Sequence, residues 1–488
     1  MIALLLFLAA APAPAVFDCA SRAGGAEGYR AHLKKCGIEE AIALATQLIA
    51  FATVNRDVDA LAQAPAFGEM EAFLRDWAAS NGLAFAVIGK RDAWQMMLGD
   101  GGALALIAHA DVEPADPKMW RSNPFAAVLQ NDKLFGRGSE DDKGPLAAAM
   151  VAVASAHAFG LPVAGIRIAI GTAEETDSAP MKRYAALAQA RYNVSIDGEF
   201  PVVFAQFGYV AWHLRIAPGG GPEASVIERI EAGEFLTQVP GRAQATIIQG
   251  AAFAAELKER ATKLRLRHTI ATAGDTLSVT VEGKSVHASL PEEGDNALLS
   301  LAELLRKLPV AHNGYKRLVD MLTDDFGYDC FARKIGLAQE DPMMGKLVIA
   351  PTLVRELPDH TIDLGVNLRR PAGMTNEAFR ARLHSTAQRL GVTEGYVFVG
   401  DPHVADVSGE LVTTLLGIYK QHEPGKAEPK IDRGGTYAKL FAGGVDFGPS
   451  FPGQPYMGHT DNEFITKREL AAQTEMLGEV ILALAVSR

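Results

Sequence analysis

The stretch Gly136–Pro145, GRGSEDDKGP, decides how the rest of the chain is interpreted. It contains three consecutive acids, Glu140, Asp141 and Asp142, and it leads into Leu146–Phe159, an alanine-rich run with helical character. Proline is preorganised for the first position of a helix, because its missing N–H would have no partner there. The acids are therefore expected just before a helix N-terminus, whose dipole relieves only part of their mutual repulsion. Two interpretations stay open: a solvent-exposed acidic cap, or a loop that binds a cation.

Length and charge limit the class of protein. With 488 residues the chain exceeds one ordinary core, so roughly two or three domains are expected. A net charge of −11 argues against nucleic acid or an anionic membrane as the main partner.

The N-terminus has the pattern of a secretory signal peptide. Ile2–Ala10 is apolar, and Ala11–Ala15 supplies the small residues of a cleavage site. The segment is too short for a stable membrane anchor. We therefore predict an exported protein, periplasmic or extracellular and without an anchor after processing; an N-terminal core segment is the alternative.

The three cysteines leave two possibilities. In an oxidising compartment Cys19 and Cys36 could pair, with Cys330 left free. Both could equally stay reduced, since spacing alone does not establish disulfide geometry.

Three short apolar runs are predicted as strands of one sheet: Leu104–Ala108, Ile166–Ile170 and Asn193–Ile196. Helical segments separate them, which is typical of a doubly wound α/β sheet. Each run leads into a loop with histidine or acidic residues. Ligands of such sheets bind at the carboxyl ends of strands, so we expect five side chains to converge there: His109, Asp141, Glu174, Glu175 and Asp197.

After about Phe207 the pattern changes to alternating, half-buried strands with helices between them, which indicates an α+β insertion. The predicted fold is an α/β domain with a doubly wound mixed sheet and an inserted α+β domain. The predicted boundaries are 1–15 for the signal peptide, 16–206 and 401–488 for the two parts of the α/β domain, and 207–400 for the insertion.

The expected donors suit a metal centre. Two imidazoles and three carboxylates could hold a pair of zinc-like ions with one carboxylate bridging, from His109, Asp141, Glu175, Asp197 and a late His459.

Two further acids have expected roles beside these donors. Asp111 lies on the same side of an extended chain as His109 and can accept from its other ring nitrogen. Glu174 precedes Glu175, so one residue of the pair can bind metal while the other acts as a base. Taken singly, each of these short motifs occurs more often by chance on a protein surface than in a metal site.

Five segments carry a resemblance to a known family: HADVEP (109–114), GRGSEDDKGP (136–145), AEET (173–176), DGEFP (197–201) and GHTDNEF (458–464). Together they resemble the co-catalytic dinuclear-zinc metallopeptidases, which include carnosinases, aminoacylases, succinyl-diaminopimelate desuccinylases and glutamate carboxypeptidases. The DGEFP segment and the long insertion are most similar to the peptidase-V-type bacterial dipeptidases.

The resemblance implies a role for each donor. His109 and Asp197 would hold one metal ion, Glu175 and His459 the other, and Asp141 would bridge them. The ions would be zinc, with manganese or cobalt as alternatives. The resemblance also implies a cis peptide bond between Asp141 and Asp142, and Glu174 as the general base that transfers a proton from water to the leaving amine.

The resemblance implies that the α/β domain is the catalytic domain and that the insertion is the family's lid domain, whose residues would contact the substrate. GKSVHASLP (283–291) resembles the lid motif whose histidine, here His287, donates to the oxyanion. NLRRP (367–371) resembles the segment whose arginine, here Arg369, holds the C-terminal carboxylate, with Arg370 as a solvated neighbour.

A loop near residue 435 also resembles the family, whereas one position in the insertion differs from it. Gly434, Gly435 and Thr436 resemble the glycine loop that closes on the same carboxylate. Thr237 stands where related lids often have an asparagine, which affects the expected substrate preference.

The prediction is an exported, metal-dependent dipeptidase for unblocked dipeptides. Two alternatives share the metal site: an N-acyl-amino-acid deacylase and a carboxypeptidase. A non-catalytic peptide-binding protein is the alternative from another class. A monomer is favoured over a homodimer, because a double-sized lid supplies what dimeric relatives take from a partner.

Overall fold

The computed structural model describes residues 24–55, 64–219, 226–423, 425 and 427–487. The predicted signal peptide and Cys19 lie outside these residues, so export and the Cys19–Cys36 pairing stay predictions. Cys330 is a free thiol. Among the described residues, no helix is long and apolar enough to cross a membrane.

The chain divides into two compact units, described separately below. Unit 1 comprises Met1–Phe204, Val404–Lys430 and Thr436–Arg488, and unit 2 comprises Ala205–His403 and Ile431–Gly435.

Unit 1 is built on a mixed sheet in which strands follow the order β1-β2-β6-β3-β7-β22. The central strand β3 runs parallel to both β6 and β7, and β22 runs parallel to β7. Strands β1 and β2 extend the sheet with antiparallel pairings. Every residue of β3, β6 and β7 is buried, as expected for strands covered on both faces. The bounds are β1 (Ala84–Ile88), β2 (Ala93–Gly99), β3 (Leu104–His109), β6 (Gly165–Gly171), β7 (Tyr192–Ser195) and β22 (Val445–Asp446).

Helix α4 (Lys143–Ala158) is the central helix of unit 1, and nearly all of it is buried. It packs against α2 (Ile38–Ile49) and α11 (Lys467–Leu484), and its alanines allow this close approach. The helix begins at Lys143, two residues before the predicted start at Pro145. Proline is tolerated there because the N–H groups of the first turn have no partner within the helix. The other helices of unit 1 are α1 (Gly25–His32), α3 (Pro65–Ser80), α5 (Ala179–Leu187) and α10 (Glu410–His422).

Two small pairings bring late segments of the chain to early ones. Strand β24 (Phe464–Thr466) pairs with β5 (Lys133–Phe135), directly before the acidic loop. Strand β23 (Pro449–Ser450) pairs with β8 (Gly198–Glu199), directly after β7. The C-terminal segment 449–466 therefore lies against the loops that follow the buried strands.

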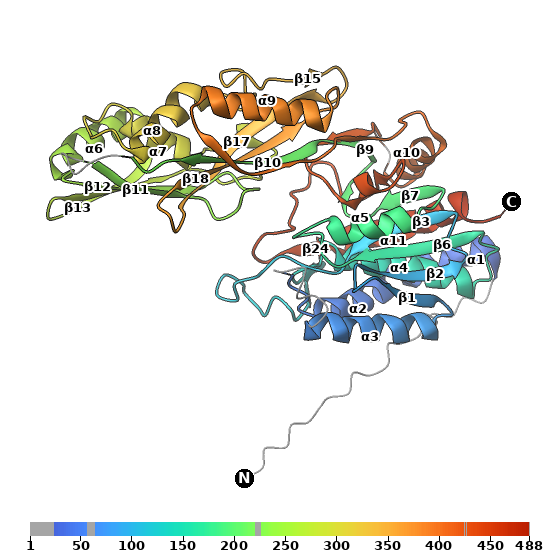
Figure 1. The fold of residues 1–488 in the computed structure, drawn as a ribbon. Coiled ribbons are helices and arrows are strands. Elements are labelled where there is room, and N and C mark those ends of the chain that lie inside the picture. The colour runs from blue at the N-terminus through green and yellow to red at the C-terminus, as the bar shows by residue number, and fades with distance from the viewer. Residues whose placement is uncertain (1–23, 56–63, 220–225, 424, 426, 488) are drawn as a thin grey trace, which may run out of the picture. The chain divides into compact units, whose positions relative to one another are not determined.

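Unit 2 has one antiparallel sheet in the order β13-β14-β12-β11-β17-β18-β10-β19. Helices α6, α7, α8 and α9 cover one face of this sheet (Figure 1), and helices and strands share one hydrophobic core. The predicted α/β fold with an inserted α+β domain is confirmed. The strands are β10 (Gly208–Ile216), β11 (Val226–Ala232), β12 (Arg242–Ile248), β13 (Arg267–Ala273), β14 (Thr276–Glu282), β17 (Val348–Glu356), β18 (Ile362–Arg370) and β19 (Thr393–Val399). The helices are α6 (Ala254–Lys263), α7 (Ala297–Leu305), α8 (Gly314–Met321) and α9 (Asn376–Arg389).

Candidate metal centre and substrate-binding residues

His109 is the last residue of β3, and its imidazole contacts two carboxylates. Its Nε2 lies 2.7 Å from Oδ1 of Asp141 and 3.7 Å from Oδ2 of Asp197. Asp197 follows β7, the parallel neighbour of β3. The carboxyl ends of adjacent parallel strands thus bring His109 and Asp197 to the same edge of the sheet, as the sequence predicted.

The second imidazole belongs to His459, from the C-terminal segment. Its Nε2 lies 2.9 Å from Oδ2 of Asp141 and 3.0 Å from Oε2 of Glu175. The two oxygens of Asp141 therefore face different imidazoles. All five predicted ligands come together in unit 1 as two clusters that share Asp141.

These residues fit divalent cations. Each cluster places an imidazole nitrogen against carboxylate oxygens, the donor types that zinc, manganese and cobalt take in proteins. Burial, reinforced by Asp141, raises the pKa of Asp197 to about 6. Burial lowers the pKa of His459, but Glu175 and Asp141 outweigh it and raise that pKa to about 12. The cluster therefore holds an excess of negative charge that bound cations would compensate.

The acid before the shared Asp141 holds the loop that carries His459. One oxygen of Glu140 accepts a hydrogen bond from Oγ of Ser450 at 2.8 Å. The other accepts from the backbone N–H groups of Met457, at 2.6 Å, and Gly458, at 3.2 Å.

The acid after Asp141 holds the other histidine. Oδ2 of Asp142 accepts a hydrogen bond from the backbone N–H of His109 at 3.1 Å. The peptide bond between Asp141 and Asp142 is cis, as the resemblance implied. Since all three acids of the loop are buried, the solvent-exposed cap is excluded.

Glu463, four residues after His459, fixes the backbone of the acidic loop. One carboxylate oxygen accepts from Nη1 of Arg137 at 2.8 Å and from the N–H of Gly138 at 3.0 Å. The other accepts from the N–H groups of Glu140 at 2.9 Å and Asp141 at 3.1 Å. Its side chain is fully buried. Glu463 lies in the segment 458–464 that carries the family resemblance, but no role was predicted for it from the sequence.

Asp111 acts differently from the expectation. Its carboxylate accepts from the backbone N–H groups of Glu174 at 3.0 Å and Glu175 at 3.1 Å. The group within hydrogen-bonding range of Nδ1 of His109, at 3.0 Å, is the carbonyl oxygen of Asp111, whereas Oδ1 lies at 3.6 Å. The carbonyl oxygen of Asp111 is therefore nearer to the imidazole than its carboxylate is.

Glu174 follows β6 together with Glu175. Burial, reinforced by the negative charge of Asp197, raises the pKa of Glu174 to about 7. Glu174 directly precedes Glu175, and the groups of converging ligand atoms found among the described residues do not include it.

Two residues near the centre were not predicted. The hydroxyl of Tyr456 donates to Oδ2 of Asp141 at 2.5 Å. Glu113 has a carboxylate oxygen within 4.8 Å of ligand atoms of Glu175 and His459. Glu113 lies in the quoted segment 109–114, but only the fold shows that it faces residues far along the chain.

In unit 2, the ring of His287 is oriented by its neighbour. Nδ1 lies 2.6 Å from Oγ of Ser289, and the backbone N–H of Ser289 donates to the same nitrogen at 3.4 Å. With Nδ1 accepting, the proton of the neutral ring is on Nε2. A role in binding an oxyanion would use this Nε2–H group as the donor.

Arg369 and Arg370 differ in how many partners they have. The buried guanidinium of Arg369 makes one long hydrogen bond, 3.4 Å from Nε to Oδ1 of Asn367, and lies 4.9 Å from the ring centre of Tyr209. Burial holds its pKa below the usual value. Among the residues that the structure describes, no hydrogen-bond partner is found for its other donors, which suits an arginine that binds a carboxylate.

The expectation that Arg370 is solvated is wrong. Its side chain is fully buried, because the next residue along a strand points to the other face of the sheet. Arg370 donates to the carbonyl of Gly400 at 3.1 Å, to the carbonyl of Met374 at 2.8 Å and to Oδ1 of Asn376.

The predicted glycine loop spans the boundary between the units. In unit 2, the N–H of Gly434 donates to Oδ1 of Asp432 at 2.8 Å, and a Cβ at Gly434 would lie 2.5 Å from Oδ2 of Asp432. Gly435 ends unit 2, and Thr436 belongs to unit 1. The hydroxyl of Thr436 donates to Oδ1 of Asp446 at 2.6 Å, so it supports the fold of unit 1.

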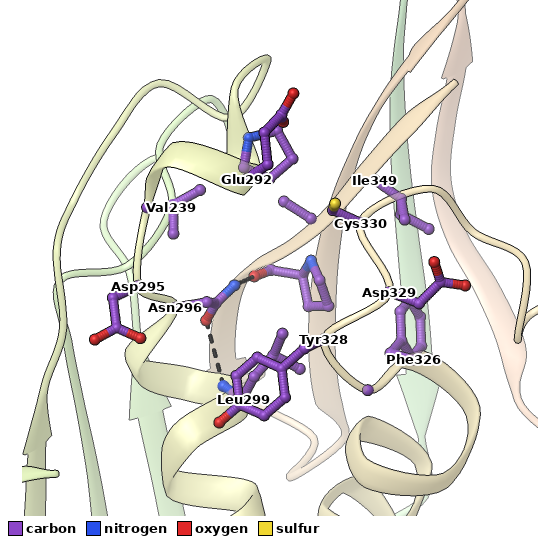
Figure 2. A pocket seen from close by; sticks show the side chains of 15 residues that line it. Val239, Glu292, Asp295, Asn296, Leu299, Phe326, Tyr328, Asp329, Cys330 and Ile349 are labelled. Atoms are coloured by element: carbon purple, nitrogen blue, oxygen red, sulfur yellow. Dashed lines mark hydrogen bonds between the residues drawn. The ribbon is translucent and has the colours of Figure 1, made fainter. Parts of the chain in front are cut away.

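Unit 2 also contains a pocket of about 310 Å³ (Figure 2). Figure 2 shows Glu292, Tyr328 and Cys330 around it. Polar side chains of the lining already serve the fold: Nδ2 of Asn296 donates to the carbonyl of Pro351 at 2.8 Å, and the carboxylate of Asp329 accepts from the N–H of Lys334 at 2.8 Å. We assign no ligand to this pocket.

Comparison with known proteins identifies the class. The family model of peptidase family M20/M25/M40 matches residues 105–483, and the chain belongs to this family. It is a metallopeptidase of the dipeptidase type.

Individual relatives agree with this class. The chain is 30% identical over 390 residues to the putative dipeptidase YtjP of Bacillus subtilis. The aligned region covers 78% of this chain and 83% of that protein. It is 29% identical over 426 residues to a putative dipeptidase of Staphylococcus epidermidis, and this alignment covers 82% of the present chain and 89% of that protein. The structure of human carnosine dipeptidase 1 has a TM-score of 0.55 at 14% identity, covering 94% of this chain and 98% of that one, which shows a shared fold.

Proposed function

We propose that the chain is an exported dipeptidase that hydrolyses unblocked dipeptides at a dinuclear metal site, with Glu174 as general base. The observation that carries the proposal is the position of Asp141, whose two oxygens face the imidazoles of His109 and His459 at 2.7 and 2.9 Å. The curated relatives in Bacillus subtilis and Staphylococcus epidermidis, both named as putative dipeptidases, support the substrate class.

The residues of unit 1 have distinct parts in the proposal. His109 and Asp197 would hold one ion, Glu175 and His459 the other, and Asp141 both. Two divalent ions at these positions would polarise the peptide carbonyl and make water nucleophilic at neutral pH.

Glu174 is the proposed proton carrier. It is adjacent to the proposed ligand Glu175, so its carboxylate could accept a proton from water and pass it to the leaving amine.

Two residues of unit 2 have proposed roles toward the substrate. Nε2–H of His287 would donate to the oxygen on which negative charge develops. The guanidinium of Arg369 would form a forked pair with the C-terminal carboxylate of the dipeptide.

Further parts of the proposal rest on the sequence. The ions are proposed to be zinc, with manganese or cobalt as alternatives, because the donor set suits all three. Export follows from the apolar N-terminal segment, and the monomeric state from the size of the inserted domain. The partner is a small peptide, with no role for nucleic acid.

The test uses the purified mature chain, stripped with a chelator and then supplied separately with zinc or manganese. Release of amino acids is followed from unblocked dipeptides and from N-acetylated or N-succinylated amino acids. We expect metal-dependent cleavage of the unblocked panel. Glu174→Gln should abolish this cleavage with metal still bound, whereas the exposed Glu69→Gln should leave it unchanged.

The outcomes separate the candidates. Cleavage of the blocked panel alone would favour the deacylase and overturn the proposed substrate. No cleavage of either panel, with two ions bound, would overturn the enzyme and favour the peptide-binding protein. An active Glu174→Gln variant would overturn the role of the base.

A further inference from the structure

Glu113 lies in the loop after β3, close to one half of the metal centre. One of its carboxylate oxygens lies within 4.8 Å of ligand atoms of both Glu175 and His459. Ligands of an ion with bonds of about 2.0–2.2 Å lie about 3–4 Å from one another. Small rotations of a glutamate side chain would therefore bring Glu113 into the coordination shell of an ion held there.

The surroundings of Glu113 give its carboxylate no other role. Within the described part of the chain, no hydrogen bond or ion pair is found at this side chain, although it is half-buried. A half-buried carboxylate beside other carboxylates is unfavourable unless a cation lies close to it.

We propose that Glu113 is an additional ligand of the ion held by Glu175 and His459. The proposal rests on the dinuclear site proposed above and deepens it. With the shared Asp141, this ion would have three carboxylates and one imidazole.

The extra carboxylate makes the two positions chemically unequal. The other ion would have only two carboxylates, from Asp141 and Asp197, with the imidazole of His109. Carboxylate-rich sites suit manganese, whereas imidazole suits zinc. The position next to Glu113 is therefore the one that retains manganese, and the removal of Glu113 weakens manganese binding more than zinc binding.

The test is calorimetric titration of the metal-free full-length protein with Mn²⁺ and, separately, with Zn²⁺. Glu113→Gln removes the charge with little change in shape. Asp116→Asn is the matched control, because it removes one exposed charge from the same loop. We expect one of the two Mn²⁺ binding steps to weaken about tenfold or more in Glu113→Gln, in line with the effect of altering metal-site residues, and Asp116→Asn to bind as the wild type does.

Further measurements keep the test decisive. Far-UV circular dichroism checks the fold of each variant, and Glu113→Asp, which keeps the charge on a shorter side chain, should lose less Mn²⁺ affinity than Glu113→Gln. If Glu113→Gln binds both Mn²⁺ ions within about twofold of the wild type, the ligand assignment is wrong. Unchanged binding with a raised KM for unblocked dipeptides would also overturn it, and would show that Glu113 binds the substrate ammonium group.

The role of Glu113 and the proposed dipeptidase function can be refuted independently of each other. Calorimetry needs no turnover, so a wild type that binds two ions but cleaves no dipeptide would contradict the function while leaving the role of Glu113 intact. A dipeptidase whose Mn²⁺ binding is unaffected by Glu113→Gln would contradict only the role of Glu113.

Discussion

Replacing Glu463 by glutamine tests the idea that this residue holds the acidic loop in place. The carboxylate accepts four hydrogen bonds: one from the guanidinium of Arg137 and three from the backbone N–H groups of Gly138, Glu140 and Asp141. In Glu463→Gln, one acceptor oxygen becomes an NH₂ group that faces donors. The guanidinium of Arg137 is then buried without its counter-charge.

The expected magnitude follows from this geometry. Removing one partner of a buried ion pair costs about 3–5 kcal/mol, because the remaining charge stays buried and uncompensated. Both side chains of the Arg137–Glu463 pair are buried, with exposed fractions of 3% and 0%. We therefore expect the free energy of unfolding of unit 1 to fall by about 3–5 kcal/mol, which lowers its Tm on the order of 10 °C.

The assay is thermal and urea unfolding of the metal-free chain, followed by far-UV circular dichroism. Glu479→Gln is the control, since Glu479 pairs with Arg30, whose side chain is 53% exposed, and such pairs contribute at most about 1 kcal/mol. If Glu463→Gln is no more destabilising than Glu479→Gln, the argument that this carboxylate organises the loop is refuted.

Two further predictions concern unit 2. Arg369→Lys should raise KM about tenfold or more with a smaller change in kcat, because lysine cannot form a forked pair with a carboxylate. Arg370→Lys should instead lower Tm, because three acceptors of Arg370 lose their partners. Steady-state kinetics and thermal unfolding of both variants check these outcomes. Burial raises the pKa of Asp363, but hydrogen bonds from His213 and Arg355 outweigh it and hold that pKa below its usual value. This stabilisation is present above the ordinary aspartate pKa of about 3.9 and is lost as the pH falls through the lowered pKa of the folded state. The Tm difference between wild type and Asp363→Asn should therefore narrow from about pH 6 to about pH 3. A Tm difference that stays constant over this range would contradict the prediction.

The sequence was most informative where a residue follows a buried strand. An apolar run followed by His109 or Asp197 predicts both a strand and the edge at which it ends, so convergence follows from the topology of a parallel sheet. The position of His459 required the family resemblance, because its loop reaches the centre through the pairing of β24 with β5.

The different hydrogen-bonding roles of the three consecutive acids could not be predicted from the sequence. Only the fold shows that Glu140 holds the loop of His459 while Asp142 holds the backbone of His109. Arg370 was misjudged for a related reason. Two adjacent arginines in a strand face opposite sides of a sheet, and the sequence does not show that both faces of β18 are covered.

The insertion of unit 2 has a consequence for the order in which the protein is made. On the ribosome, β3, β6 and β7 are synthesised first, then about 200 residues of unit 2, and only afterwards β22 and His459. Domains generally fold as units as they emerge, so unit 2 can complete its own core while unit 1 still lacks a strand of its sheet. A chain that stops before residue 459 would therefore carry a folded insertion and four of the five proposed metal ligands, because only His459 would be missing.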